Sequence, residues 1–261
     1  MLSIVMPARD EEGSIVETIT GIVERLRGER IAYEVIVVDD GSRDGTRECV
    51  LALGCADAGI RLVENEGRHG FGMAVRAGLP HCAGDAVVIM MADGSDSPAD
   101  LVTYYRKFEE GHSCVFGSRF MRGAKVIGYP AHKRLINRLA NWFIKVLFGL
   151  RYNDTTNAFK CYSREAIEHM QPLIAPHFNL TVEMPLKAIV RGFPYTVVPI
   201  TWTNRKAGAS KLKINEMGSR YLFIVLYLWL EKTLSRGDYA RAERQETPGQ
   251  ENAEKAGADH V

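Results

Sequence analysis

The sequence predicts an α/β fold with a mostly parallel sheet flanked by helices. Short β-branched runs recur through the first half of the 261-residue chain and alternate with segments compatible with helices. Polar stretches follow three of these runs, as expected at strand ends. Such alternation favours right-handed crossovers between parallel strands. We therefore expect the three polar stretches, PARDEE, DDGSRDGT and ADGSDSP, to meet in one crevice beyond the carboxyl ends of the strands.

The elements of the first half follow from these runs. Strands are predicted at residues 2–6, 34–38, 60–63, 86–90 and 114–117. The segment 14–26 is predicted to be a helix with Ser14 as its N-cap, and the segment 70–82 is also compatible with a helix. A further helix is expected to begin near Pro98.

The second half changes character after a basic and then apolar helical segment at 130–150. Strands are predicted at 159–163 and 195–200, and helices around 180–192 and at about 214–234. We expect a main domain at 1–212 that includes the amphipathic segment 130–150, then a C-terminal apolar helix at 213–235. The tail at 236–261 is charged and poor in apolar residues, and we expect it to be disordered.

Composition narrows the function classes. Acidic and basic residues nearly cancel at a formal charge of +1, so we expect no nucleic-acid partner. The five cysteines show no metal-binding spacing, which fits a reducing cytoplasm. We expect no signal peptide, because the start turns acidic at Asp10. We also expect no membrane span, because the longest apolar run, Tyr221 to Leu230, covers half of the roughly 20 residues that a span needs.

The stretch DDGSRDGT, at 39–46, places two carboxylates at a predicted strand end. Gly41 permits a tight turn, and Ser42 and Asp44 are candidate helix caps. A capped turn is one explanation of the stretch. A nucleotide site, in which a carboxylate binds ring N–H or ribose hydroxyl groups, explains it equally well. The chain has no GxGxxG or Walker pattern, which argues against the usual dinucleotide and ATP loops.

The stretch ADGSDSP, at 92–98, offers Asp93 and Asp96 directly after an apolar run. Hard cations such as Mg2+ take carboxylate oxygens together with the oxygens of a substrate diphosphate. The sequence therefore allows a metal site here. The competing interpretation is a turn into the next helix, with Asp96 as its cap.

The basic stretch RKAGASK, at 205–211, carries three cations around Gly208 and a hydroxyl on Ser210. Such donors suit a diphosphate leaving group, although a solvated basic loop explains them equally well. Glu183 is expected either to orient one of these cations or to serve in a structural pair.

Two apolar helical segments carry basic residues, and together they favour binding in the membrane interface. In 132–150 the cations Lys133, Arg134, Arg138 and Lys145 accompany Trp142, Phe143 and Phe148. In the second segment, Arg220 and Lys232 flank the run from Tyr221 to Leu230. The alternative is burial, which we expect for about half of the apolar residues.

Several motifs occur together in an order that resembles the family 2 glycosyltransferases of GT-A fold, especially the dolichyl- or polyprenyl-phosphate sugar (mannose) synthases. The signature VVDDGSxDGT is complete at 37–46, and P-x-x-N-E appears at 7–11 with Asp10 in place of Asn. GSRF stands at 117–120, D-x-T-x-x-F at 154–159 and R-x-x-G-x-S-K at 205–211. The resemblance runs from residue 2 to about 234.

The resemblance implies a nucleotide-diphosphate sugar donor, a divalent metal ion (Mg2+ or Mn2+), inversion at the anomeric carbon and a polyprenyl phosphate acceptor. Donor contacts would come from Pro7, Glu11, Val38, Asp40, Ala92, Arg119, Arg205 and Lys211. The catalytic group would be Asp93, Asp154, Arg205 and Lys211, with Asp93 and Ser95 on the metal and Lys133, Arg134 and Arg138 at the acceptor phosphate. Asp154 would position groups, or act as a base toward a hydroxyl acceptor.

The chain departs from the family pattern in three places. The D-A-D motif of the synthases reads Met91-Ala92-Asp93, and a thioether offers little to a hard cation. The acceptor motif T-S-G-F-R or T-G-S-F-R reads Thr156 to Lys160, as TNAFK, and Asn137 stands where the family often has Ser. These changes lie where sugar and acceptor are chosen.

The sequence thus predicts an inverting glycosyltransferase that is cytoplasmic, peripheral to the membrane and active in cell-envelope or glycolipid synthesis. An integral membrane partner is left open. One alternative is an enzyme of the same fold that glycosylates a hydroxyl, and another is a non-catalytic nucleotide-sugar binding protein, suggested by Met91. A nucleotidyltransferase is disfavoured, because no glycine-rich pyrophosphate loop follows the first strand.

Overall fold

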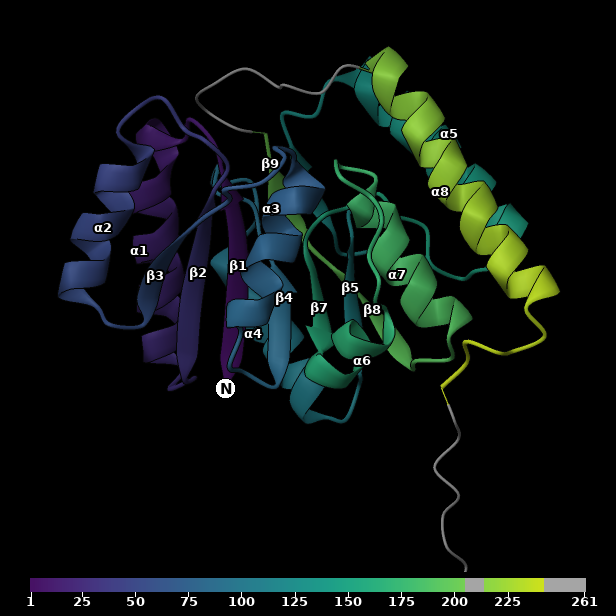
Figure 1. Ribbon diagram of the computed structural model, residues 1–261, viewed down its shortest axis with the longest axis horizontal. Helices are drawn as coiled ribbons and strands as arrows, with labels where there is room; N and C mark the ends of the chain where they lie inside the picture. The colour runs from purple at the N-terminus through teal and green to yellow at the C-terminus, as the bar shows by residue number, and fades with distance from the viewer. Residues whose placement is uncertain (205–213, 242–261) are drawn as a thin grey trace, which may run out of the picture.

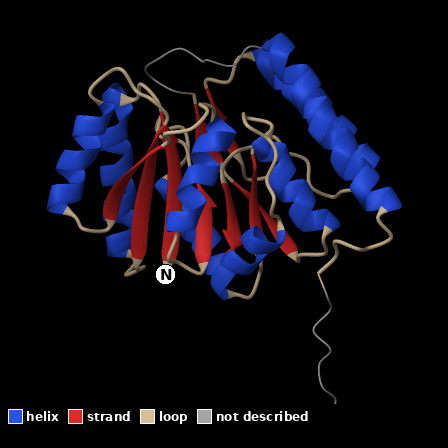
Figure 2. Ribbon diagram, viewed as in Figure 1, coloured by secondary structure: helices blue, strands red, loops and turns tan. Residues whose placement is uncertain are grey.

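A computed structural model describes residues 1–204 and 214–241 of the chain (Figure 1). Its centre is a seven-stranded sheet of order β3-β2-β1-β4-β7-β5-β8 (Figure 2). These strands are β1 (Leu2–Ala8), β2 (Tyr33–Asp39), β3 (Ile60–Glu64), β4 (Ala86–Ile89), β5 (Cys114–Ser118), β7 (Lys160–Ser163) and β8 (Tyr195–Pro199). Only β7 runs antiparallel to its neighbours, so the prediction of a mostly parallel sheet is confirmed.

Helices cover both faces of this sheet, and a small second sheet lies at its edge. The helices are α1 (Glu12–Gly28), α2 (Thr46–Ala56), α3 (Phe71–Gly78), α4 (Pro98–Glu109), α5 (Ala131–Phe148), α6 (Arg164–His169), α7 (Leu180–Val190) and α8 (Ile214–Leu234). The strands β6 (Lys125–Ile127) and β9 (Thr201–Thr203) pair in parallel outside the main sheet. Neither β6 nor β9 was predicted from the sequence.

Two apolar cores form because successive strand side chains point to opposite faces. In β1, Ile4 and Met6 pack into one core against α1, whereas Val5 packs into the other against α3. All three side chains are fully buried. Near-continuous apolar runs are what a parallel sheet covered on both faces requires.

Three predicted helix caps differ from the structure. Helix α1 begins at Glu12, with Glu11 at the N-cap, because the Glu11 backbone N–H is bound by Thr46 Oγ1 at 2.8 Å. Ser14 therefore lies inside the first turn. Helix α2 has Gly45 at its N-cap rather than Ser42 or Asp44, although Asp44 Oδ1 accepts from the Thr46 N–H at 3.1 Å.

The competing interpretation of Asp96 as the cap of α4 is also wrong. Ser97 is the N-cap, and its hydroxyl accepts from the Ala99 N–H at 3.3 Å. Asp96 instead turns inward, where its carboxylate accepts from the Met91 N–H at 3.1 Å. Helix α3, which precedes α4, ends at Gly78, four residues before the predicted end at 82, because a 3-10 turn containing Pro80 follows it.

Helices α5 and α8 lie side by side at one end of the sheet (Figure 1). The Lys232 ammonium donates to the Phe148 carbonyl at 2.6 Å, which joins their C-terminal ends. Both helices leave large apolar side chains exposed: Leu135, Ile136, Leu139, Trp142, Phe143 and Val146 on α5, and Leu222, Phe223, Leu226, Tyr227, Leu230 and Leu234 on α8. Among the described residues, no helix is both long and apolar enough to cross a membrane.

Candidate active site

The three polar stretches meet at the carboxyl ends of β1, β2 and β4, as predicted. The Asp10 N–H donates to Ser42 Oγ at 3.0 Å, and the Arg43 N–H returns a bond to Asp10 Oδ1 at 2.8 Å. The third stretch joins through Ala92, whose carbonyl accepts from Ser14 Oγ and Thr18 Oγ1, each at 3.2 Å. These bonds hold the three stretches together at this edge of the sheet.

Asp40 is the buried carboxylate at the end of β2. It accepts from Asn65 Nδ2 at 2.7 Å and from the Gly70 N–H at 2.9 Å, and His69 Nδ1 lies 3.2 Å from it. Pro7 and Val38 pair across β1 and β2, and Val38 lies two residues before Asp40. The predicted donor contacts Pro7, Val38 and Asp40 are thus brought together.

Sequence reasoning missed His69 and Asn65 as neighbours of Asp40. Gly70, which follows His69, has a φ of 143°, and a Cβ there would lie 2.5 Å from the Pro176 carbonyl. A glycine is therefore required where this loop passes residues 176–177. The pair His69-Gly70 just after a strand was the one signal available in the sequence.

Asp93 and Asp96 occupy the loop after β4 and are 8% and 5% exposed. The Ser95 N–H donates to Asp93 Oδ1 at 3.1 Å, which closes the turn. Burial, and next the charge of Asp93, raise the pKa of Asp96 to about 7. Two close carboxylates in one buried loop are a donor set that a divalent cation stabilises.

The described residues contain no group of three or more His, Cys, Asp or Glu side chains that could hold a metal ion. A cation here would therefore be held by one or two carboxylates and by a ligand diphosphate. Mg2+ is commonly bound in this way. The chemistry of Asp93 fits such an ion, and the backbone N–H of Ser95, the other predicted ligand, donates to Asp93 Oδ1. Met91 contributes its backbone N–H to Asp96 instead of a ligand.

Arg119 and Asp154 form a buried ion pair at the end of β5. Arg119 Nε and Nη2 donate to the two Asp154 oxygens at 2.9 and 2.7 Å, and the Arg119 N–H adds a third bond at 2.8 Å. Burial alone would lower the pKa of Arg119, but the Asp154 charge and these bonds outweigh it and raise that pKa. Asp154 thus acts here as a fixed support for Arg119.

Aromatic rings surround the Arg119 guanidinium. Its central carbon lies 5.5 Å from the ring centre of Phe120, 5.6 Å from that of Tyr129 and 5.9 Å from that of Trp202. These contacts are within the range of cation–π attraction. Sequence reasoning did not find Tyr129 and Trp202, because they stand 10 and 83 positions after Arg119 and outside every motif.

Lys160 lies fully buried behind this pair. Its ammonium donates to the Thr155 carbonyl at 3.0 Å and to the Thr181 carbonyl at 3.1 Å. Burial lowers the pKa of Lys160 to about 7, against the opposing charge of Asp154. Lys160 therefore ties the loop after Asp154 to the first turn of α7. The Thr155 hydroxyl is the one buried side-chain oxygen without a partner among the described residues.

The predicted acceptor-phosphate cations lie on the first half of α5. Arg134 and Arg138 are exposed and Lys133 is half-buried. The Arg138 guanidinium carbon lies 5.8 Å from the ring centre of Phe120, on whose ring Arg119 also packs. Arg138 is thereby the α5 cation linked to the buried ion pair.

Two predicted residues, Arg205 and Lys211, lie outside the described part of the chain. Glu183, one proposed partner of their loop, serves in a structural pair instead. It contacts the Lys187 ammonium at 2.7 Å and accepts from the Ile174 and Ala175 N–H groups at 2.8 and 2.7 Å. Glu183 and Lys187 are both fully buried in α7.

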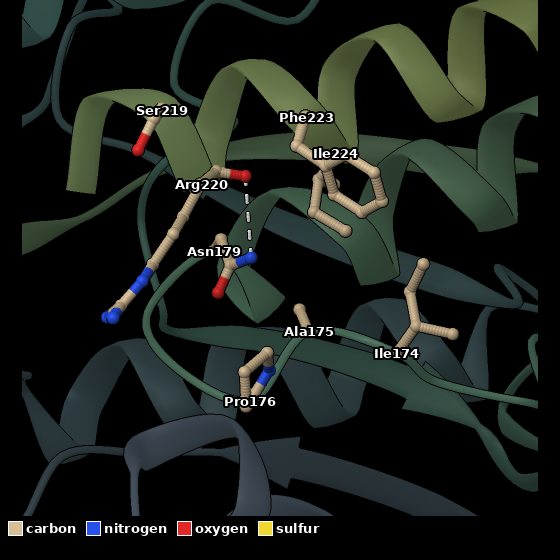
Figure 3. A pocket seen from close by; sticks show the side chains of 8 residues that line it. All are labelled: Ile174, Ala175, Pro176, Asn179, Ser219, Arg220, Phe223 and Ile224. Carbon is tan, nitrogen blue, oxygen red and sulfur yellow. Dashed lines mark hydrogen bonds between the residues drawn. The ribbon is translucent and has the colours of Figure 1, made fainter. Parts of the chain in front are cut away.

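A shallow pocket of about 300 Å3 opens between α8 and the segment before α7 (Figure 3). Phe223 and Ile224 form one wall, and Ile174 and Pro176 lie opposite. The Asn179 amide donates to the Arg220 carbonyl at 3.4 Å across it. The pocket contains no predicted site residue, and it adjoins the apolar face of α8 through Phe223.

The family model described as Glycosyl transferase family 2 matches residues 3–170. The chain belongs to this family. It is therefore a glycosyltransferase, and the seven-stranded sheet is that of a GT-A fold. The resemblance inferred from VVDDGSxDGT and the other motifs is confirmed.

Two curated relatives resemble the chain over most of its length. The polyprenol monophosphomannose synthase of Mycolicibacterium smegmatis is 29% identical over 215 residues, which cover 80% of each chain. The undecaprenyl-phosphate mannosyltransferase of Micrococcus luteus is 26% identical over 202 residues, which cover 76% of this chain and 83% of its own.

Solved structures share the fold. The glucosyl-3-phosphoglycerate synthase of Mycobacterium tuberculosis, in complex with Mn2+, uridine diphosphate and phosphoglyceric acid, superposes with a TM-score of 0.65. The match covers 89% of this chain and 78% of that one, at 22% identity. A second structure of that synthase, with Mg2+ and uridine diphosphate, gives a TM-score of 0.64 at 21% identity.

Proposed function

We propose that the protein transfers a sugar from a nucleotide-diphosphate sugar to a polyprenyl phosphate, with inversion, at the surface of a membrane. One observation carries the proposal: the exposed apolar face of α5 and α8 is joined, through Arg138 and Phe120, to the buried Arg119–Asp154 pair. A glycosyltransferase for a soluble acceptor has no need of such a face. The names of the two mannosyltransferase relatives support the same acceptor class.

The donor would lie in the crevice at the ends of β1, β2 and β4. Asp40 would accept from a base N–H, and Pro7, Glu11, Val38 and Ala92 would shape the same end of the site. Arg119, Arg205 and Lys211 would hold the diphosphate, whose charge develops as the bond to the sugar breaks.

A divalent ion, Mg2+ or Mn2+, would be held by Asp93, next to Ser95, and by the donor diphosphate. When bound it would neutralise charge on the leaving diphosphate. Asp96 would not ligate the ion directly, because its carboxylate already accepts a hydrogen bond from the Met91 N–H. Structures of the distant relative with Mn2+ or Mg2+ and uridine diphosphate support this choice of ions.

The acceptor phosphate would approach from the α5 side, where Lys133, Arg134 and Arg138 carry positive charge. A phosphate monoester is already ionised near neutral pH, so its oxygen can attack the anomeric carbon without a strong general base. Asp154 is consistent with that requirement, because both of its oxygens bind Arg119. Its role would be to position Arg119, and catalysis would rest on alignment and charge stabilisation.

We place the enzyme in the cytoplasm, peripheral to the membrane. All five cysteines are free, as expected in a reducing compartment. The apolar residues of α5 and α8 would enter the interface while the flanking cations meet anionic lipid headgroups. An integral membrane partner that covers part of this face would be compatible with the same geometry.

The acceptor decides between this proposal and its competitors. Purified protein is incubated with radiolabelled nucleotide sugars, Mg2+ or Mn2+, and vesicles that contain either polyprenyl phosphate or the free polyprenol. We expect label in the organic phase only with the phosphate. Transfer to the free alcohol or to a water-soluble hydroxyl would favour the second glycosyltransferase interpretation, and donor binding without turnover would favour a binding protein.

A further inference from the structure

The packed face of helix α5 carries one buried polar side chain, Asn141, which is 1% exposed. The other buried residues of this helix are the apolar Ile144 and Phe148. An amide in such a place destabilises the fold unless its polar atoms are bonded. Its partners therefore show what the side chain is for.

Within residues 1–204 and 214–241, Asn141 binds a single residue outside its own helix, Thr156, and does so twice. Its amide nitrogen lies 2.9 Å from Thr156 Oγ1, and its amide oxygen accepts from the Thr156 N–H at 3.1 Å. Asn137, one turn earlier, completes the group: its Oδ1 lies 2.6 Å from Asn141 Nδ2 and accepts from Thr156 Oγ1 at 3.0 Å. We name these three residues the α5 latch.

The latch holds the loop that carries Asp154. Thr156 is two residues from Asp154, whose carboxylate binds Arg119 at three points. The same loop is fixed from the other side, because the Tyr152 hydroxyl lies 2.6 Å from the Asp154 carbonyl oxygen and 3.0 Å from that of Gly117. Movement of α5 relative to this loop would therefore break the latch.

A second contact, besides the latch, joins α5 to the Arg119–Asp154 pair. Arg138 lies on α5 beside Asn137, and its guanidinium carbon is 5.8 Å from the Phe120 ring, while that of Arg119 is 5.5 Å from the same ring. The latch therefore sets how far the α5 cation stands from the buried cation. Buried polar groups are best attested in this role of fixing the register between elements.

We propose that Asn141 is a positioning residue for the acceptor: through Thr156 it holds α5 so that Arg138 presents the acceptor phosphate beside Arg119, which holds the donor diphosphate. The inference rests on the proposed function, since it names the device that aligns the acceptor of that reaction. The donor contacts Asp40 and Asp93 lie on other elements, and Arg119 is held by its own three bonds to Asp154, so we expect donor binding to be independent of the latch.

The test separates acceptor from donor kinetics. Asn141→Leu places an apolar side chain of similar size in the site and removes the hydrogen bonds of the latch. Ala140→Leu adds the same side chain at the neighbouring exposed position and is the control. We expect Asn141→Leu to raise the KM for polyprenyl phosphate tenfold or more. We expect the KM for the nucleotide sugar and the binding to lipid vesicles to change less than twofold, and Ala140→Leu to leave both KM values unchanged.

A second variant guards against loss of folding. Thr156→Val removes the hydroxyl but leaves the Thr156 N–H bond to Asn141, so we expect a smaller rise in the acceptor KM. The double variant Asn141→Leu/Thr156→Val should be little worse than Asn141→Leu alone, because both changes break one network. Additive effects of the two changes would contradict the latch.

The inference is overturned if folded Asn141→Leu or Thr156→Val protein keeps the wild-type acceptor KM, or if the donor KM rises as much as the acceptor KM. Failure of the proposed function itself is a separate outcome. In that case the wild-type protein would give no lipid-linked product with any nucleotide sugar, although the nucleotide raises its melting temperature.

Discussion

The guanidinium of Arg119 and the carboxylate of Asp154 form a two-point ion pair whose side chains are 8% and 0% exposed. The two residues stand 35 positions apart, at the end of β5 and in the loop before β7. A buried pair of this kind costs desolvation, so it is weak evidence of a stabilising design. The charge of Arg119 acts on Asp96 in the acid loop after β4, which supports the proposal that the pair holds a cation ready for a phosphate ligand.

Breaking this pair should damage both stability and turnover. We expect Asp154→Asn to lower the free energy of unfolding by about 3 to 5 kcal/mol, because it leaves a buried guanidinium without its counter-charge. Glu109→Gln removes the carboxylate of the exposed pair with Arg106 and should cost no more than about 1 kcal/mol. Urea unfolding of both variants checks this, and equal costs would contradict the account of Arg119.

The metal assignment concerns Asp93. We expect Asp93→Asn to abolish the stimulation of sugar transfer by Mg2+ or Mn2+ while the melting temperature of the ligand-free protein stays within a few degrees. Removal of metal from the wild-type protein with a chelator should have the same effect on transfer, reversed by added ion. Full metal-dependent turnover of Asp93→Asn would show that the ion is held elsewhere. Asp85→Asn, which changes an exposed carboxylate, is the control.

The lowered pKa of Lys160 predicts how the free energy of unfolding changes with pH. Its pKa is lowered to about 7 in the folded protein, so between about pH 7 and its usual pKa the unfolded chain binds more protons. Stability should therefore rise with pH across this window, by at most about 1.4 kcal/mol per pH unit from this group. We expect Lys160→Met to lose that rise between pH 7 and 8.5. Urea unfolding measures the free energy of unfolding of the wild-type protein and of Lys160→Met at each pH. The same pH dependence in both proteins would contradict this role of Lys160.

The apolar face of α5 and α8 should bind lipid. Phe223 is 62% exposed on α8, and Leu51, on α2 far from this face in Figure 1, is 49% exposed. We expect Phe223→Ser to weaken binding to anionic vesicles about tenfold or more, because full burial of such a side chain contributes about 1.5 to 3 kcal/mol. Leu51→Ser should have no effect. Vesicle sedimentation measures both, and equal effects would argue against this face.

The strands and the crevice could be predicted from local sequence, because β-branched runs and acidic turns are local patterns. The runs at 34–38 and 86–90 became β2 and β4, and the acids after them lie at the strand ends. The direction of β7 could not be predicted in the same way. Its four residues carry no sign of direction, which is set instead by pairing with Ala86–Ile89 and Cys114–Phe116.

The surroundings of the site residues were out of reach for a related reason. The sequence showed Arg119 and Asp154 in separate motifs, but the aromatic contacts of Arg119 come from Tyr129 and Trp202, on two other elements. Asp96 was considered as a helix cap because it comes shortly before Pro98. Its carboxylate instead accepts a hydrogen bond from the Met91 N–H and is buried. Such outcomes depend on tertiary contacts that no spacing rule records.

The most direct test of the central claim is mass spectrometry of the vesicle lipids after reaction with a nucleotide sugar and metal ion. The account predicts a new lipid whose mass is that of the polyprenyl phosphate plus one sugar, formed by the wild-type protein and absent with Asp93→Asn. An unchanged polyprenyl phosphate, with the sugar found on a water-soluble product or left on the nucleotide, would contradict it.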